Sequence, residues 1–172
     1  MYAKALYELA EEASIEEKVL DELTEVVRIL KSEPDYIRLA DAYTLPAKQR
    51  AALLGEAFGG QIEEILLNTM KLLAEKNALS VLPECEKAYR SLYYDRHRIT
   101  TAAITSAVPL SEDQKARLLA ALEKKSGKRV LASYTTDGSV RGGIRIEMDG
   151  ASYDNTVSTK LMRLERLLSN RA

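Results

Sequence analysis

The sequence has one cysteine, one histidine, one phenylalanine and no tryptophan among its 172 residues. Because Cys85 stands alone, no disulfide can form within the chain and no cysteine-rich metal site can be built. A single imidazole, His97, nearly excludes histidine-rich metal sites, and any Ser-His-Asp triad would have to use it. Cys85 falls on an apolar helix stripe and His97 at a helix end, so we predict a buried structural thiol and a helix-terminal cation.

Charge of one sign and long hydrophobic runs are also missing. The formal net charge is −1, so the chain as a whole has no attraction for nucleic acid or an anionic membrane. No apolar run approaches the roughly 20 residues that a membrane-spanning helix needs. The N-terminal stretch MYAKALYELAEEAS has acids where a signal peptide has a basic region. The sequence therefore predicts a protein that is made and kept in the cytoplasm.

From Tyr2 to about Arg98 the apolar residues recur at helical spacing. Capping residues, prolines and glycines divide this stretch into six predicted helices joined by short links. They are expected over residues 2–13, from Ser14 to Leu30, from Pro34 to Ala40, from Pro46 to Gly59, over Gln61–Lys76, and from Ser80 onward. Six short-linked helices indicate an all-α bundle.

After Arg98 the pattern changes. Ile99–Val108 is β-branched and alanine-rich without a polar face of helical period, which predicts a strand. Ser111 gives a start signal and Gly127 a stop signal for a helix between them. Two further strands are expected in RVLASYT and GGIRIEM, and the pair Asp149–Gly150 is a hairpin turn signal.

A closing helix from Asn155 would align Val157, Leu161, Leu164 and Leu168 on one face. The predicted fold class is therefore α+β, mainly α. An N-terminal six-helix bundle over residues 1–98 is followed by a small β-α-β-β-α domain over residues 99–172. The second domain is small enough to be only marginally stable alone.

The glycine pair Gly142–Gly143 does not belong to a chemical motif. No Lys-Ser/Thr follows it, so it lacks the residues that hold phosphate and magnesium in a P-loop. A calcium loop starting at Asp137 also fails, because Arg141 and Met148 stand where oxygen ligands belong. We predict that the glycines allow positive φ or close approach at the start of a strand. No catalytic residue, metal site or cofactor is predicted.

Two helices are apolar over more of their circumference than a surface helix needs. On the helix from Gln61, the apolar arc covers roughly 220°, whereas about 100° is enough to face a core. The first helix is similarly wide. Two explanations remain open: a centrally buried helix, or a groove that accepts a partner's amphipathic helix.

The groove explanation divides these arcs into core and partner surface. It predicts that Tyr7, Leu67 and Met70 are partly exposed. It places four leucines in the core: Leu6, Leu9, Leu66 and Leu73. The full predicted partner-binding set is Ala3, Tyr7, Ala10, Leu67, Met70 and Ala74.

The order of motifs resembles the delta subunit of F-type ATP synthases, the bacterial counterpart of the mitochondrial oligomycin sensitivity-conferring protein. It starts with YAKALYELA and continues with AVPLSEDQKARLLAALEKKSGKRV. It closes with an Asp-x-Ser-x-x-Gly-Gly-Ile-x-Ile stretch, an Asp-x-Thr-Val and a Leu-rich helix. Gly138, Arg141 and Asn155 depart from the family's usual residues, and the pair Asn155–Thr156 stands where Gly-Ser is usual. The matching C-terminal signature is Asp137, Ser139, Gly142, Gly143, Ile144, Ile146, Asp154, Thr156, Val157 and Leu161.

The resemblance implies a non-catalytic stator subunit that links the α3β3 catalytic head to the peripheral stalk. It implies that the N-terminal domain binds N-terminal segments of the α subunits through its first and fifth helices. The C-terminal domain would contact the ends of the b subunits. The protein would be peripheral at the cytoplasmic face of the cell membrane, without membrane insertion, nucleic acid or cofactor.

An alternative is a two-domain regulatory module that binds protein or nucleic acid. A nucleic-acid module would need a basic stripe and base-reading side chains, and the sequence shows neither. An enzyme is the third alternative, with one histidine, one cysteine and no cofactor motif to support it.

Overall fold

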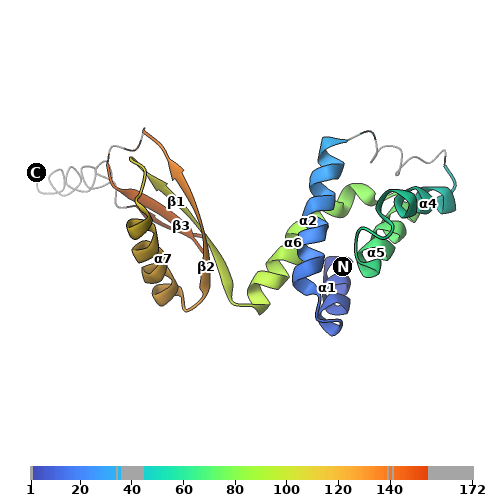
Figure 1. Ribbon diagram of the computed structural model, residues 1–172, viewed down its shortest axis with the longest axis horizontal. Helices are drawn as coiled ribbons and strands as arrows, with labels where there is room; N and C mark the ends of the chain where they lie inside the picture. Colours follow the sequence, from blue (N-terminus) through green and yellow to red (C-terminus); the bar gives the residue numbers. More distant parts are fainter. Residues whose placement is uncertain (1, 34, 36–44, 139, 141, 155–172) are drawn as a thin grey trace, which may run out of the picture. The chain divides into compact units, whose positions relative to one another are not determined.

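The computed structural model of the chain describes residues 2–33, 35, 45–138, 140 and 142–154 (Figure 1). The chain divides into two compact units, Met1–Arg96 and His97–Ala172. The first unit is helical and the second is built on a β-sheet with a helix packed against it.

Five α-helices and a 3-10 turn come before the first strand in the described part of the chain, so the predicted six-helix bundle is wrong as stated. The predicted helix from Pro34 to Ala40 lies, apart from Asp35, outside the described residues. The start of the second helix also differs, because Ser14 has a φ of 55° and cannot adopt the extended N-cap conformation. The observed elements are α1 (Tyr2–Glu12), α2 (Glu16–Ser32), α4 (Ala47–Phe58), α5 (Glu64–Glu75), the 3-10 turn η1 (Leu79–Val81) and α6 (Leu82–Arg96).

The core of this unit includes an aromatic pair between α1 and α6. The rings of Tyr7 and Tyr89 meet edge to face, with centroids 5.3 Å apart. The hydroxyl of Tyr89 donates to the main-chain carbonyl of Glu16, at 3.0 Å, which fixes α6 to the start of α2. The hydroxyl of Tyr7 is buried and has no hydrogen-bond partner within the described residues. Both rings therefore pack in the core, but within the described residues only the Tyr89 hydroxyl adds a hydrogen bond to the fold.

Two charged side chains are buried among the described helices, those of Arg50 in α4 and Glu86 in α6. Arg50 of α4 is only 4% exposed, and it lies in line with the buried Leu54 and Phe58 on the same helix face. Its guanidinium donates to the carbonyls of Ala74, at 2.9 Å, and Glu75, at 3.0 Å. These carbonyls belong to the last turn of α5, where a helix has acceptors without intrahelical donors. Arg50 thus caps α5 and joins it to α4.

The second unit contains a mixed sheet with strand order β2-β1-β3-β4. The central strand β1 pairs in parallel with β2 along its whole length, with Ile99 opposite Arg129 and Ser106 opposite Thr136. It pairs antiparallel with β3, which continues into β4. The fourth strand was not predicted. The elements are β1 (Ile99–Ser106), α7 (Glu112–Ser126), β2 (Arg129–Thr136), β3 (Ile144–Met148) and β4 (Ala151–Asp154).

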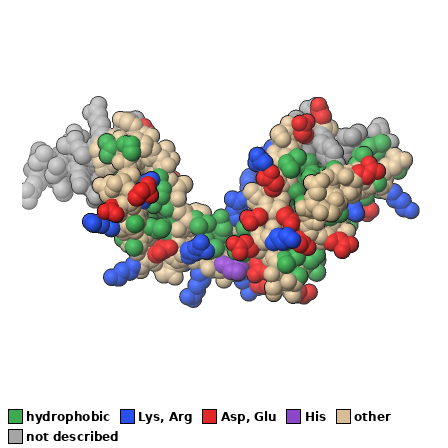
Figure 2. Space-filling model, in the orientation of Figure 1, with side chains coloured by type: hydrophobic (Ala, Val, Ile, Leu, Met, Phe, Trp, Pro, Cys, Tyr) green, Lys and Arg blue, Asp and Glu red, His purple; other side chains and the backbone are tan. Residues whose placement is uncertain are grey.

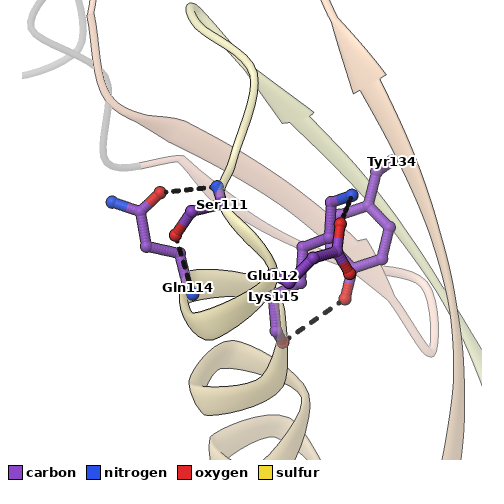
Figure 3. A network of polar contacts seen from close by, with 5 residues as sticks. All are labelled: Ser111, Glu112, Gln114, Lys115 and Tyr134. Carbon is purple, nitrogen blue, oxygen red and sulfur yellow. Dashed lines mark hydrogen bonds and ion pairs between the residues drawn. The ribbon is translucent and has the colours of Figure 1, made fainter.

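The connecting helix α7 begins and ends where the sequence predicted. Ser111 and Gln114 form a capping box: the Gln114 amide donates to the Ser111 hydroxyl, and the Gln114 side chain accepts from the Ser111 amide (Figure 3). Gly127 ends the helix in the left-handed conformation, with φ of 65°. At the first turn, the Lys115 ammonium pairs with Glu112 and lies 5.4 Å from the centre of the Tyr134 ring of β2. These contacts attach the start of α7 to the edge strand.

The core of the second unit lies between α7 and one face of the sheet. Its buried members come from β1, α7, β2 and β3, so the helix and three strands share one apolar layer. They are Ala102, Ile104, Leu122, Val130 and Met148. Alternate residues of β1 are buried, as expected for a strand with one face against a helix.

Glycines shape both ends of β3. Gly142 and Gly143 have φ of 74° and 92°, which confirms the positive φ predicted at the start of this strand. At the other end, Asp149 and Gly150 have φ of 51° and 73° and form the predicted two-residue hairpin turn, now seen to lead into β4. The Thr100 hydroxyl donates to the Asp149 carboxylate at 2.6 Å, and this bond lowers the pKa of Asp149.

The predicted closing helix from Asn155 lies outside the described residues. So do four signature positions: Ser139, Thr156, Val157 and Leu161.

Candidate protein-interaction surface

The first helix presents a different face to the core from the one predicted. Leu6 is buried as expected, but Tyr7 is buried too, although partial exposure was predicted. Leu9, placed in the core by the sequence, is 49% exposed. Ala3 and Ala10 are also buried. The prediction for α1 is therefore wrong in the division between core and surface.

Helix α5 shows the same reversal. Leu66 and Leu73 are in the core as predicted, but Leu67 and Met70, predicted to be partly exposed, are buried with them. Leu72 is instead 42% exposed. Ala74 is buried, so all six residues of the predicted partner-binding set are inside the unit. Whether any of them contributes to partner binding stays a prediction.

The reason lies in how a wide apolar arc is divided. The buried residues of α5 cover about 120° of the helix circumference, enough for its contacts with α1 and α4. The remaining apolar part of the arc lies on the opposite edge from the one predicted. Each helix has a row of apolar or weakly polar side chains that are exposed or half-buried. We call these rows the α1 strip (Tyr2, Leu9) and the α5 strip (Ile65, Thr69, Leu72). Because α1 packs against α5, the two strips lie on neighbouring helices.

Cys85 and His97 are the residues that could have carried chemistry, and the structure tests the role predicted for Cys85. Cys85 is buried, as predicted, and burial raises the pKa of its thiol, which disfavours the reactive thiolate. His97 directly follows the last residue of α6 and is exposed (purple in Figure 2). No cluster of three or more potential metal-ligating side chains occurs in the described residues. No described helix has the length and apolar character to cross a membrane.

Both signs of charge occur on each unit among the described residues. On the face shown in Figure 2, acidic and basic side chains are interspersed over each unit. Most ion pairs are local, such as Lys4 with Glu8 and Lys87 with Glu84, and such exposed pairs contribute little. On the helical unit, Leu9 of the α1 strip and Leu72 of the α5 strip are large apolar side chains exposed to solvent, a feature of surfaces that bind other proteins.

Comparison with known proteins identifies the family to which the chain belongs. The family model described as "ATP synthase delta (OSCP) subunit" matches residues 1–168. The ATP synthase subunit delta of Halalkalibacterium halodurans is 30% identical over 97% of this chain and 92% of its own. That of Clostridium perfringens is 29% identical over 99% of this chain and 95% of its own. The chain therefore belongs to the ATP synthase delta (OSCP) subunit family, which confirms the resemblance seen in the sequence.

A solved structure supports the fold. A chain of the Toxoplasma gondii mitochondrial ATP synthase hexamer, determined by cryo-electron microscopy, superposes with a TM-score of 0.66. The likeness covers 97% of this chain and 94% of the other, at 22% sequence identity. At that identity the match supports the fold and nothing further.

Proposed function

We propose that this protein is the non-catalytic stator subunit of an F-type proton-translocating ATP synthase. It links the catalytic α3β3 head to the b subunits of the peripheral stalk, so that the head resists the torque of the rotor. The observation that carries the proposal is the family match, which extends over residues 1–168 and so includes both units. The protein would act at the cytoplasmic face of the cell membrane as a peripheral subunit of the complex.

The helical unit is proposed to bind the N-terminal segment of an α subunit along α1 and α5. The exposed strips support this role, since Leu9 and Leu72 present large apolar side chains to solvent on these two helices. An amphipathic helix laid over the strips would remove that apolar surface from water. The buried members of the predicted set, such as Met70, would support the site from within. The second unit is proposed to contact the b subunits.

Charge substitutions can separate surface from core. Leu72→Asp should leave the protein folded, because an exposed side chain loses little burial. It should weaken binding of a peptide of the α subunit's N-terminus by at least about 100-fold, since docking would desolvate an unpaired carboxylate. Val81→Asp is the matched control, because Val81 is 44% exposed on the same unit but lies in η1. Met70→Asp should unfold the unit, because Met70 is fully buried.

The measurements are thermal melts by circular dichroism and peptide titration by fluorescence anisotropy. In co-purification with α and b subunits, Leu72→Asp should lose α and retain b. Normal peptide binding by a folded Leu72→Asp variant would mean that the α segment docks elsewhere. If wild-type protein bound neither α nor b, the stator assignment itself would be wrong.

A further inference from the structure

A hollow on the helical unit shares no residue with the α1 and α5 strips. It lies between α2 and the link from α4 to α5 and has a volume of about 430 Å³. This volume is within the range of pockets that hold ligands or partner side chains, about 300–1,000 Å³. Its floor is apolar and its rim is acidic, so we call it the acidic groove. The floor consists of Val26, Ile29, Phe58 and Ile62.

The floor of the acidic groove leaves apolar surface in contact with water. Val26 and Phe58 are buried and belong to the core, and Ile62 is half-buried. Ile29 is 40% exposed although it is a large aliphatic side chain. A partner side chain placed on Ile29 would therefore gain hydrophobic stabilisation without any rearrangement of the core.

The rim of the acidic groove carries three carboxylates, and none of the described residues that line it is basic. Glu22 accepts a hydrogen bond from the main-chain amide of Glu63, at 2.7 Å, which holds the start of α5 against α2. Glu25 is paired with Arg28 one turn along the helix. Asp21 is exposed and makes no hydrogen bond or ion pair with any described residue. Within the described part of the chain, Asp21 is thus the rim carboxylate that a cation from a partner would pair with.

We propose that the acidic groove binds a basic amphipathic helix of a partner protein. Glu22, Val26 and Ile29 are spaced by four and three residues, so they form one ridge of α2 along which a second helix can lie. Aliphatic side chains on the partner would cover Ile29 and Ile62. Lysine or arginine beside them would reach Asp21 and Glu25. The preference for cations must be local to the groove, because the net charge of the whole chain is only −1.

The test uses the full chain and two labelled peptides of about five helical turns. Both have leucine at helical spacing on one face; one has lysines on the other face and its isomer has glutamates. Anisotropy titrations should show binding of the lysine peptide, weakening as salt is raised, and at least about tenfold weaker binding of the glutamate peptide.

Three variants identify the site. Asp21→Lys should weaken the lysine peptide about three- to tenfold and strengthen the glutamate peptide. Ile29→Asp should stay folded, because Ile29 is on the surface, and should weaken the lysine peptide at least about thirtyfold. Glu84→Lys on α6 makes the same change in net charge away from the groove and should have little effect. Leu72→Asp should also bind the lysine peptide normally, which separates this groove from the α1 and α5 strips.

The proposal fails if the lysine peptide does not bind at millimolar concentration, or if both peptides bind equally well. It also fails if Asp21→Lys and Glu84→Lys change the affinity by the same factor, since the attraction would then be non-specific. Normal affinity in a folded Ile29→Asp variant would place the peptide elsewhere on the chain.

Discussion

Arg50→Met removes the cap that α4 provides to α5 while keeping an unbranched apolar stem. The Arg50 guanidinium donates to the main-chain carbonyls of Ala74 and Glu75 in α5, at 2.9 and 3.0 Å, and to that of Leu45, just before α4. Hydrogen bonds to charged groups are worth about 1.5–3 kcal/mol each, and a cation at a helix C-terminus adds about 0.5–1 kcal/mol. Removing the charge also recovers part of its desolvation cost. We therefore expect the free energy of unfolding to fall by about 3–4 kcal/mol.

Methionine cannot satisfy the carbonyls that Arg50 leaves behind. Among the described residues, the buried Ala74 carbonyl would keep only main-chain donors, such as the amide of Asn77 at 3.1 Å. Arg50→Lys keeps the charge but offers a single compact ammonium in place of the guanidinium fork, so it should recover less than half of the loss.

The assay is urea unfolding of the full chain followed by far-ultraviolet circular dichroism, which reports mainly on the helical unit. Lys48→Met is the matched control, because Lys48 is exposed on the same helix and loses the same charge. Its unfolding free energy should stay within about 0.5 kcal/mol of the wild type. If Arg50→Met is destabilised by less than about 1 kcal/mol, the carbonyls are satisfied in another way and the capping argument is wrong.

Three further predictions concern other polar groups and the glycine turn. Tyr89→Phe should lower the free energy of unfolding by about 1 kcal/mol, since it removes a made hydrogen bond, while Tyr7→Phe should be neutral or stabilising; urea melts of both variants check this. The pKa of Asp149 is lowered in the folded protein. Its ionised carboxylate therefore stabilises the folded state above the unfolded pKa of about 3.9, and this stabilisation is lost as pH falls through the lower folded pKa. Melting temperatures of wild type and Asp149→Asn should therefore differ at neutral pH and converge in acid; a constant gap would contradict the assignment. Gly143→Val should lower the free energy of unfolding by about 1–3 kcal/mol, because φ is 92° there, and an unchanged melting temperature would show that the turn adapts.

Local signals predicted several caps and turns, although the N-cap expected at Ser14 does not form. The Ser111 and Gly127 caps located α7 because each acts within one helical turn of its own residue. The Asp149–Gly150 turn was predicted for the same reason, since positive φ is a property of the residues themselves. The strand after it, Ala151–Asp154, was missed because four residues with a single aromatic carry too little periodicity to indicate a strand.

Local sequence signals could not predict which part of a wide apolar arc lies in the core and which part lies on the surface. Leu9 and Met70 are equally plausible core residues on a helical projection, and only the positions of neighbouring helices decide between them. The buried Arg50 did leave a signal, because it lies four residues before Leu54 and eight before Phe58 on an otherwise apolar ridge. A charged residue in register with a core stripe indicates a buried polar contact, although its carbonyl partners on α5 lie 24 and 25 residues away.

The central position of β1 has a consequence for synthesis of the chain. Ile99–Ser106 carries no charge, proline or glycine, which is the composition of a segment prone to cross-β association. The two strands that pair with β1 begin at Arg129 and Ile144. During synthesis β1 therefore leaves the ribosome well before either strand that covers its edges. The helical unit ahead of it depends less on such distant strand pairing and can form first. During that interval β1 is exposed on the nascent chain, and we expect conditions that slow elongation through α7 to increase aggregation of the newly made protein more than its equilibrium stability would indicate.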